Sequence, residues 1–379
     1  MIKKIYYWSP FFSDIATIKA VLNSVISISK FAKNDLKPTL INVIGEWDSY
    51  KDIILKNNIE VIDLKLSKNF KKKKIRGFFQ SRYYQIKIFI LAFFPLISIL
   101  KRNKPDIFVL HLVTSLPLFL NYLFNFKSKI ILRISGLPKL NIFRKLFWKI
   151  AIKKVDIITT PTIATKNHLQ KILNKKEIYL LRDPIIYVKE INKKQINYKN
   201  HKSESNIYVA IGRLTKQKNF LFLLNCFKKI IDINKNNYLY ILGNGENYRK
   251  LEEFIKKNNL EKNIFLEGYK ENIYKYLNKA RAFILSSLWE DPGFVLVEAS
   301  YSNTTIISSD CENGPKEILD ENKNGFLFKS NDYNSFIETF DRFEKTNSKE
   351  ISIKKINAKK MSKNFSLFSH YCELNKILN

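Results

Sequence analysis

The sequence contains only three cysteines, and their positions exclude two classes of protein. Cys226, Cys311 and Cys372 are widely scattered and odd in number. A disulfide framework requires paired cysteines and a zinc knuckle requires closely spaced ones, so neither is indicated. With 379 residues, of which 45% are hydrophobic, the chain is long enough for two globular domains with ordinary cores.

The sequence also shows no typical signal peptide and no apolar stretch long enough to span a membrane. The basic N-terminus MIKKIYYWSPFFSD is followed by an apolar stretch that Pro10 and Asp14 interrupt, and it offers no cleavage site. One stretch, residues 88–100 (IFILAFFPLISIL), is unusually apolar, but it contains Pro95 and is too short to cross a bilayer. We therefore expect a cytoplasmic protein in which residues 88–100 form a buried or surface-docked helix, with burial favoured.

Several nucleotide- and metal-binding signatures do not occur. There is no Walker A sequence, and the turn that contains Gly243 and Gly245 has Tyr248 where the dinucleotide fingerprint requires a third glycine. No Asp-x-Asp pair occurs anywhere in the chain. We therefore expect no bound cofactor and no catalytic metal. We also recognise no nucleic-acid-binding module.

Acidic residues are scarce, and they are scarcest in the first half of the chain. Residues 1–190 hold 35 Lys/Arg against 12 Asp/Glu, whereas residues 191–379 hold 31 against 22. A coding bias toward lysine explains the total of +32 but not its concentration in one half. A basic half indicates an anionic partner, which would be a membrane surface, a nucleic acid or a phosphorylated substrate.

Short apolar runs alternate with helical stretches along most of the chain. Seven runs precede residue 188 and six follow residue 206, and several are apolar on both faces, as buried parallel strands are. This alternation predicts an α/β fold with two doubly wound, Rossmann-like sheets. We assign a first domain to residues 1–187, a polar linker to 188–206, a second domain to 207–360 and a C-terminal helical segment to 361–379.

The second half contains two glycine turns that follow predicted strands. In AIGRLTKQKNF (210–220), Gly212 ends a strand, and Arg213 and Lys218 lie near the start of the next helix, where cations and backbone N–H groups suit a pyrophosphate. In ILGNGENYRKLEEF (241–254), the turn at Gly243–Gly245 either approaches a nucleotide closely or is a simple strand-to-helix turn.

The stretch LWEDPGFVLVEAS (288–300) separates two acids with a Pro-Gly turn. This turn places Glu290 on a loop and Glu298 on the early turns of the helix that follows. The N–H groups of Gly293, Phe294 and Val295 begin that helix and favour an anion. A phosphate flanked by two carboxylates that accept hydrogen bonds from hydroxyls matches the chemistry of a nucleotide sugar.

Residues 206–330 resemble the donor domain of retaining glycosyltransferases of family four, which have the GT-B fold. The motifs that carry the likeness occur in the family's order. They are GRLTKQK, GNGENYRKLEE, FLEGYKENIYKYLNKARAFILSSLWEDPGFVLVEAS and SSDCENGPKEIL with NGFLF. The resemblance implies that Glu290 faces the donor sugar and Glu298 the ribose, and that Arg213 and Lys218 bind the diphosphate. It implies further donor contacts from Gly212, Gly245, Gly268, Tyr269 and residues 293–295.

The first half is less similar to that family. Its first strand is followed by SPFFSDIATIKAV (9–21), without the glycine pair of many relatives. Where many relatives have a histidine, ILRISGLPKLN (131–141) has Ser135, with Arg133 nearby. We assign Ser135, Arg133 and Asp14 to the acceptor side. His111 ends a strand and either faces the substrate or packs in the core. Residues 364–378 resemble the family's last helix, which returns to the first domain.

The resemblance implies a retaining, metal-independent hexosyltransferase. Its donor would be a nucleotide diphosphate-sugar, with a UDP-sugar favoured, and its acceptor a lipid-linked saccharide or other glycan in surface polysaccharide or lipopolysaccharide assembly. Alternatives are a nucleotide-sugar epimerase of the same fold and a basic nucleic-acid-binding protein.

The basic segment NFKKKKIRGFF (69–79) indicates how such an enzyme would reach a membrane. Its lysines are set among Phe70, Phe78 and Phe79, a composition typical of loops that lie on anionic lipid. A solvated basic loop is the alternative. We expect peripheral attachment to the inner face of the plasma membrane, without nucleic acid as a partner.

Overall fold

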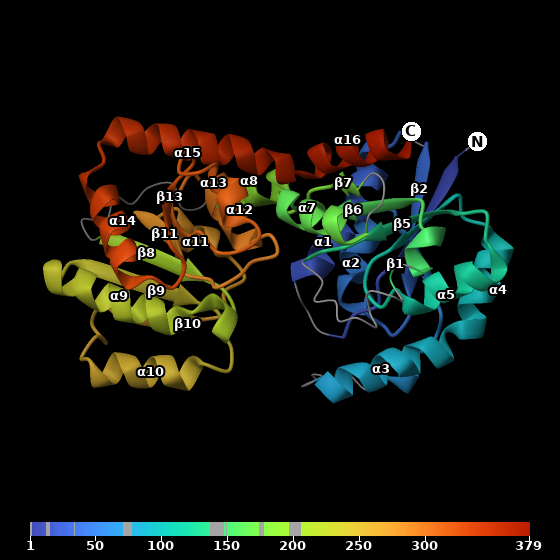
Figure 1. Cartoon of the computed structure of the whole chain (residues 1–379), viewed down its shortest axis with the longest axis horizontal. Helices are drawn as coiled ribbons and strands as arrows, with labels where there is room; N and C mark the ends of the chain where they lie inside the picture. The colour runs from blue at the N-terminus through green and yellow to red at the C-terminus, as the bar shows by residue number, and fades with distance from the viewer. Residues whose placement is uncertain are drawn as a thin grey trace. The chain divides into compact units, whose positions relative to one another are not determined.

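The computed structural model divides the chain into two compact units. The first comprises residues 1–184 and 367–379, and the second comprises 185–366. The structure describes residues 2–12, 16–33, 35–70, 78–136, 148, 150–173, 178–196 and 206–379. Each unit contains one parallel sheet covered by helices, so the predicted α/β architecture with two Rossmann-like sheets is confirmed (Figure 1).

The first unit contains a seven-stranded sheet in the order β3-β2-β1-β4-β5-β6-β7. Every strand pair in it is parallel, and Trp8 at the end of β1 lies beside Leu110 at the end of β4. The strands are β1 (Lys3–Trp8), β2 (Leu36–Asn42), β3 (Glu60–Asp63), β4 (Ile107–Leu110), β5 (Lys129–Arg133), β6 (Ile157–Thr160) and β7 (Ile178–Leu180). Because the strands are parallel, the residues that follow them gather at one edge.

The helices of the first unit cover the apolar faces of this sheet. They are α1 (Ala16–Phe31), α2 (Lys51–Lys56), α3 (Phe78–Leu91), α4 (Phe93–Asn103), α5 (Ser115–Phe124), α7 (Ile163–Leu173) and α16 (Leu367–Leu378). The last helix, α16, packs on α1 although more than 300 residues separate them, and Figure 1 shows the red helix beside the blue one. The core of this unit includes Trp8, Phe108 and Leu116, which are all almost fully buried.

The second unit contains a six-stranded parallel sheet in the order β10-β9-β8-β11-β12-β13. Its strands are β8 (Asn206–Ile211), β9 (Asn237–Leu242), β10 (Ile264–Gly268), β11 (Ala282–Leu285), β12 (Thr305–Ser309) and β13 (Phe326–Phe328). Its helices are α8 (Val188–Ile196), α9 (Phe220–Ile233), α10 (Tyr248–Lys257), α11 (Tyr274–Leu277), α12 (Phe294–Tyr301), α13 (Pro315–Leu319), α14 (Tyr333–Lys345) and α15 (Ser348–Ser362). Aromatic rings of β13 and α14 pack edge to face in its core.

Two segments differ from the sequence-based expectation. Residues 188–196, expected to be part of an irregular linker, form helix α8, in which Ile191 is buried. Only one face of this helix packs on the second unit, so its sequence is mostly polar and the helix is hard to predict from the sequence. The units divide at residues 184/185 and 366/367, so α15 ends in the second unit and α16 begins in the first.

The apolar stretch 88–100 lies in α3 and α4. Ile88, Leu96 and Leu100 are buried, as expected, but Ile90 and Phe94 on the other side are exposed. Within the described residues, no single helix has the length and hydropathy needed to cross a membrane, and residues 80–91 and 93–103 meet that test only as a pair bent by 49°.

Candidate active site

The carboxyl edge of the second sheet brings together the loops that the sequence motifs identify. Strands β10, β9, β8 and β11 are neighbours in that order. The loop after β8 carries Arg213 and Lys218, and the loop after β11 carries Glu290. Backbone hydrogen bonds join these two loops, since Leu288 N donates to Gln217 O over 2.8 Å. This edge therefore brings together side chains that are distant in the sequence.

A buried ion pair lies at the centre of this edge. Lys218 Nζ donates to Glu290 Oε1 at 2.5 Å, and Ser287 Oγ donates to the same oxygen at 2.5 Å. The lysine and glutamate side chains are 13% and 5% exposed. Both contacts use Oε1, and within the described part of the chain Oε2 has no protein hydrogen bond. Oε2 and two remaining N–H groups of the ammonium are thus the atoms that can bind a ligand.

Two glycines allow the ion pair to lie close to the backbone. A Cβ atom at Gly212 would lie 3.0 Å from Lys218 Cε, so a larger residue there would displace the lysine side chain. Gly293 has a φ of 96°, a left-handed conformation that glycine adopts without strain, and a Cβ atom added to it would lie 3.5 Å from Glu290 Cγ. A larger residue would therefore displace Lys218 at position 212 and would have a strained backbone at position 293.

Helix α12 begins directly beside Glu290. Gly293 precedes its first residue, and Phe294 and Val295 occupy the first turn, as the sequence predicts. Glu298 follows one turn later and is half-buried. Burial, followed by the negative charge of Glu298, raises the pKa of Tyr274. The two acids of the motif thus lie on a loop and a helix on either side of a helix N-terminus, which favours an anion.

The remaining donor-side residues line the neighbouring strand ends. The loop after β9 packs on the loop after β8 so closely that a Cβ at Gly245 would lie 2.4 Å from Leu214 O. Gly268 ends β10 with its carbonyl accepting from Gly243 N at 2.8 Å, and Tyr269 beside it is 69% exposed. Arg213 is exposed at the same edge. All of these predicted residues therefore follow neighbouring strands of one sheet.

Among the described residues, this edge contains cations and hydrogen-bonding groups but no cluster of metal ligands. In the described ranges, no three histidine, cysteine, aspartate or glutamate side chains are arranged to hold a metal ion. The chemistry available is the binding of an anion by Lys218, Arg213 and backbone N–H groups, and the binding of hydroxyls by carboxylates.

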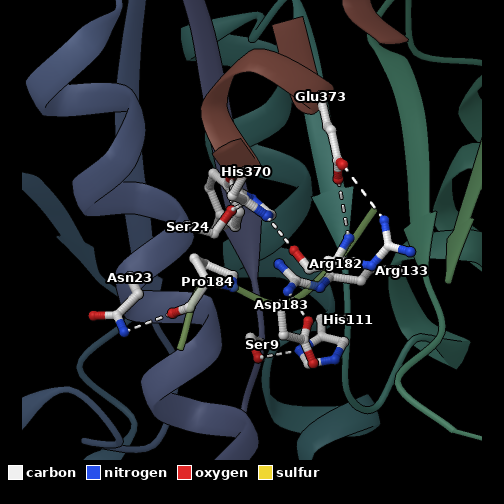
Figure 2. Close-up of polar contacts among 11 residues, drawn as sticks. Ser9, Asn23, Ser24, His111, Arg133, Arg182, Asp183, Pro184, His370 and Glu373 are labelled. Carbon is white, nitrogen blue, oxygen red and sulfur yellow. Dashed lines mark hydrogen bonds and ion pairs between the residues drawn. The ribbon is translucent and has the colours of Figure 1, made fainter. Parts of the chain in front are cut away.

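The corresponding edge of the first sheet holds a different polar cluster (Figure 2). Arg133, at the end of β5, is paired with Asp183, which follows β7, and the two side chains are 4% and 3% exposed. His111, after β4, lies 3.4 Å by its Nδ1 from Ser9 Oγ, after β1. Burial and the charge of Arg133 hold the pKa of His111 well below its usual range, so this imidazole is neutral.

His370 of α16 fixes the C-terminal helix to this cluster (Figure 2). Its Nδ1 lies 2.7 Å from the carbonyl oxygen of Arg182 and its Nε2 lies 2.7 Å from Ser24 Oγ. A carbonyl only accepts, so Nδ1 carries the proton and Nε2 accepts from the serine hydroxyl. Burial lowers the pKa of His370 to about 3, which keeps the ring in this neutral form. Glu373 also contacts Arg182, at 3.7 Å.

The acceptor-side residues predicted from the sequence differ in burial, and one of them lies outside the described residues. Ser135 follows β5 and is half-buried. Arg133 is buried and forms an ion pair with Asp183. An acceptor would have to displace that carboxylate to reach the guanidinium group. Asp14 lies outside the described residues. His111 is buried, and its Nε2 has no hydrogen-bond partner within the part of the chain that the structure describes.

Sequence reasoning missed three polar residues at these two edges. Asp183 lies two residues after the apolar run IYLL, and its position just beyond a strand end was the available signal. Ser287 was included in a strand run, and no motif marks it as the partner of Glu290. Glu46 follows β2, accepts from Val43 N and Ile44 N, and has its pKa raised to about 8 by burial.

Comparison with known proteins finds a family model that matches residues 190–363. This segment matches the family model of glycosyl transferases group 1. An uncharacterized glycosyltransferase of Methanocaldococcus jannaschii is 34% identical over 252 residues, which cover 60% of this chain and 61% of the relative. The UDP-Gal:alpha-D-GlcNAc-diphosphoundecaprenol alpha-1,3-galactosyltransferase of Escherichia coli is 31% identical over 161 residues, which cover 42% of this chain and 41% of the relative. The chain therefore spans less than two thirds of either relative.

The fold of the whole chain has solved counterparts. A glycosyltransferase from Rickettsia africae superposes with a TM-score of 0.76 at 16% identity, and the match covers 99% of this chain and 97% of the other. At that identity the likeness establishes the fold. The chain has the GT-B fold, and its residues 190–363 match the family model of glycosyl transferases group 1.

Proposed function

We propose that the protein is a retaining glycosyltransferase that transfers a sugar from a nucleotide diphosphate-sugar to an acceptor hydroxyl. The observation that carries the proposal is the buried Lys218–Glu290–Ser287 contact beside the N-terminus of α12, within the group 1 domain. It combines a fixed cation, a carboxylate with one oxygen available and a helix start, which are the groups that a diphosphate and a sugar require.

In this proposal each residue binds one part of the donor. Lys218 and Arg213 bind the diphosphate together with the first N–H groups of α12. Glu290 accepts from a hydroxyl of the sugar through Oε2, and Glu298 accepts from the ribose. Ser287 and Lys218 hold the Glu290 carboxylate in one orientation, which spares that ordering cost when the donor binds.

The reaction breaks the bond between the sugar's anomeric carbon and the diphosphate oxygen. Negative charge grows on the departing diphosphate, and Lys218, Arg213 and the helix N-terminus stabilise it. The acceptor oxygen attacks the same face of the sugar and gives its proton to a departing phosphate oxygen. The paired carboxylates that a hydrolase uses are not needed, because the leaving group is itself the base.

The names of relatives indicate the class of donor and acceptor. By its name, the Escherichia coli relative uses UDP-Gal as donor and a sugar linked to diphosphoundecaprenol as acceptor. By analogy, we propose a UDP-sugar as donor and a lipid-linked saccharide as acceptor, in surface polysaccharide assembly at an anionic membrane. In this proposal Lys218 and Arg213 supply the positive charge at the diphosphate, so we expect the transfer to proceed without a metal ion or another cofactor.

Incubation with a panel of nucleotide sugars tests the proposal. Release of nucleoside diphosphate is measured with and without a membrane extract, and the anomeric configuration of the product is read by NMR. We expect release to require one nucleotide sugar plus the extract, and to fall in Glu290→Gln but not in Glu312→Gln, whose side chain is exposed beside the site. Conversion of the sugar without an acceptor would instead identify an epimerase.

A further inference from the structure

Helix α3 is apolar on the side that faces solvent. Tyr83, Ile86 and Ile90 are spaced three and four residues apart, so they share one face of the helix, and they are 61%, 60% and 65% exposed. Ile88 is fully buried on the opposite side. A helix on the surface of a globular unit ordinarily has one apolar stripe, which it buries. The second stripe of α3 therefore lacks a covering element among the described residues.

Large exposed apolar side chains also occur on α4, which packs on α3, and on α5, which packs on α4. Phe94 at the start of α4 is 76% exposed, and Tyr122 and Leu123 on α5 are 58% and 51% exposed. We call these three residues, with Tyr83, Ile86 and Ile90, the apolar patch. Isolated exposed hydrophobic residues are ordinary on protein surfaces, but a contiguous group indicates an interaction site.

Aromatic contacts join the three helices beneath this patch. Phe94 contacts Phe93 with ring centroids 5.2 Å apart, and Phe93 contacts Phe89 at 6.5 Å. Phe89 in turn contacts Phe119 of α5 at 5.6 Å. The patch is thus one surface supported by a packed aromatic layer, and Figure 1 shows α4 and α5 next to each other in the first unit.

The charge around the patch has one sign. Residues 64–105 contain twelve lysines and arginines and no aspartate or glutamate. Lys101 and Arg102 are exposed at the end of α4, and Lys101 Nζ lies 4.7 Å from the ring centroid of Phe124. Cations beside exposed aromatic and aliphatic side chains match the two layers of an anionic bilayer surface, which are charged headgroups above acyl chains.

We propose that the apolar patch inserts into the interface of an anionic bilayer, with Lys101 and Arg102 contacting its headgroups. A second copy of the chain fits less well, because it would place two strongly basic surfaces against each other. The inference builds on the membrane setting of the proposed function, but vesicle binding needs neither donor nor acceptor, so each can fail without the other.

The patch replaces part of the membrane contact expected from the sequence. Phe70, counted among the aromatic residues of the segment 69–79, is buried in the core of the first unit, and Lys87 Nζ lies 5.1 Å from the centroid of its ring. It is therefore not available for insertion. Lys71–Lys74 and Arg76 lie outside the described residues.

An environment-sensitive fluorophore at Phe94 reports insertion directly. Cys226 and Cys311 are buried, so Phe94→Cys in a Cys372→Ser background gives one readily labelled thiol. We expect a blue shift of an NBD label with vesicles that contain phosphatidylglycerol, and none with phosphatidylcholine vesicles. The control is Ile353→Cys on α15, where the native side chain is 50% exposed. Equal shifts at both positions, or none at residue 94, would overturn the proposal.

Vesicle co-sedimentation of the full chain tests the two components of the surface. Ile90→Ser with Phe94→Ser, and separately Lys101→Ser with Arg102→Ser, should each weaken binding to phosphatidylglycerol vesicles by roughly tenfold or more. Matched controls are Ile353→Ser with Ile356→Ser on α15, and Lys256→Ser with Lys257→Ser on α10. Binding that the patch variants do not change would contradict the assignment. A stable dimer that these variants dissociate, without vesicle binding, would show that the patch is a protein interface.

Discussion

Each unit buries an ion pair at the carboxyl edge of its sheet, but the two pairs have different surroundings. Arg133 and Asp183 in the first unit are 4% and 3% exposed and lie beside the neutral His111 and the residues that hold α16. Lys218 and Glu290 in the second unit are 13% and 5% exposed and lie beside Gly212, Gly293 and the start of a helix.

The difference lies in which hydrogen-bonding atoms remain available. The first pair is almost fully buried, and among the described residues its two charges are paired with each other. The second pair is covered in part by glycine backbone, and the ammonium and the carboxylate keep atoms that a ligand can reach. A buried charge pair is costly to break, because it leaves one charge without its partner. We infer that the first pair stabilises its unit and that the second binds substrate.

The largest expected effect is on the stability of the first unit. Arg133→Met should lower its free energy of unfolding by about 3–5 kcal/mol, because Asp183 would remain buried without its partner. Arg281→Met is the control, since its pair with Glu344 is 37% and 33% exposed and should contribute at most about 1 kcal/mol. Urea unfolding measures both. The double variant Arg133→Met with Asp183→Leu should recover most of the loss. Similar small losses in both single variants would remove the contrast between the pairs.

A slightly smaller effect is expected on catalysis at the second pair. Glu290→Gln should lower the transfer rate by about 100- to 1000-fold, or roughly 2.7–4 kcal/mol in the transition state, because one oriented charge contact is lost. Circular dichroism and the rate of nucleoside diphosphate release are measured on the same preparation, with Glu312→Gln as control. A rate within a few-fold of wild type would mean that Glu290, like Arg133, has a structural role.

Lowering the pH should reduce the stability of the first unit through His370. The pKa of His370 is lowered to about 3, against about 6.5 in an unfolded chain. Between these values the unfolded state binds a proton that the folded state excludes, so stability falls as pH decreases from about 6.5 toward 3, by up to about 1.4 kcal/mol per pH unit. Glu46, with its pKa raised to about 8, has the opposite dependence from pH 4.5 to 8.

The contribution of His370 is therefore read as a difference between variants. We expect His370→Gln to be less stable than wild type at pH 7, by an amount that diminishes as the pH is lowered to 5. Urea unfolding at several pH values measures this difference. The exposed His168 provides the control, and His168→Gln should leave the pH dependence unchanged. A pH-independent loss in His370→Gln would mean that this ring binds a proton as readily in the folded state as in the unfolded state.

The smallest expected effect is that of a chelator. Transfer should be unchanged in EDTA, because Lys218 and Arg213 supply at the second edge the positive charge that a divalent ion supplies elsewhere. Loss of activity in EDTA, restored by magnesium or manganese, would show that these cations are insufficient.

The strands and the local shape of the candidate site could be predicted from the sequence. All thirteen strands in the described part of the chain overlap the short apolar runs that predict them, because most strands of a parallel sheet covered by helices are apolar on both faces. The turn at Pro292 and Gly293, the loop position of Glu290 and the helix that carries Glu298 follow equally from neighbouring residues. Such features are fixed by backbone sterics and by burial over one element.

The contacts between side chains that are distant in the sequence became visible in the tertiary structure. Lys218 reaches Glu290 across 72 residues, Arg133 reaches Asp183 across 50, and His370 reaches Ser24 across 346. These contacts depend on the order of strands in the sheet and on the return of α16 to the first unit, neither of which a periodicity encodes. The same applies to α3, whose apolar residues face both inward and outward. A sequence pattern counts apolar residues, but the packing of the surrounding elements determines which of them stay exposed.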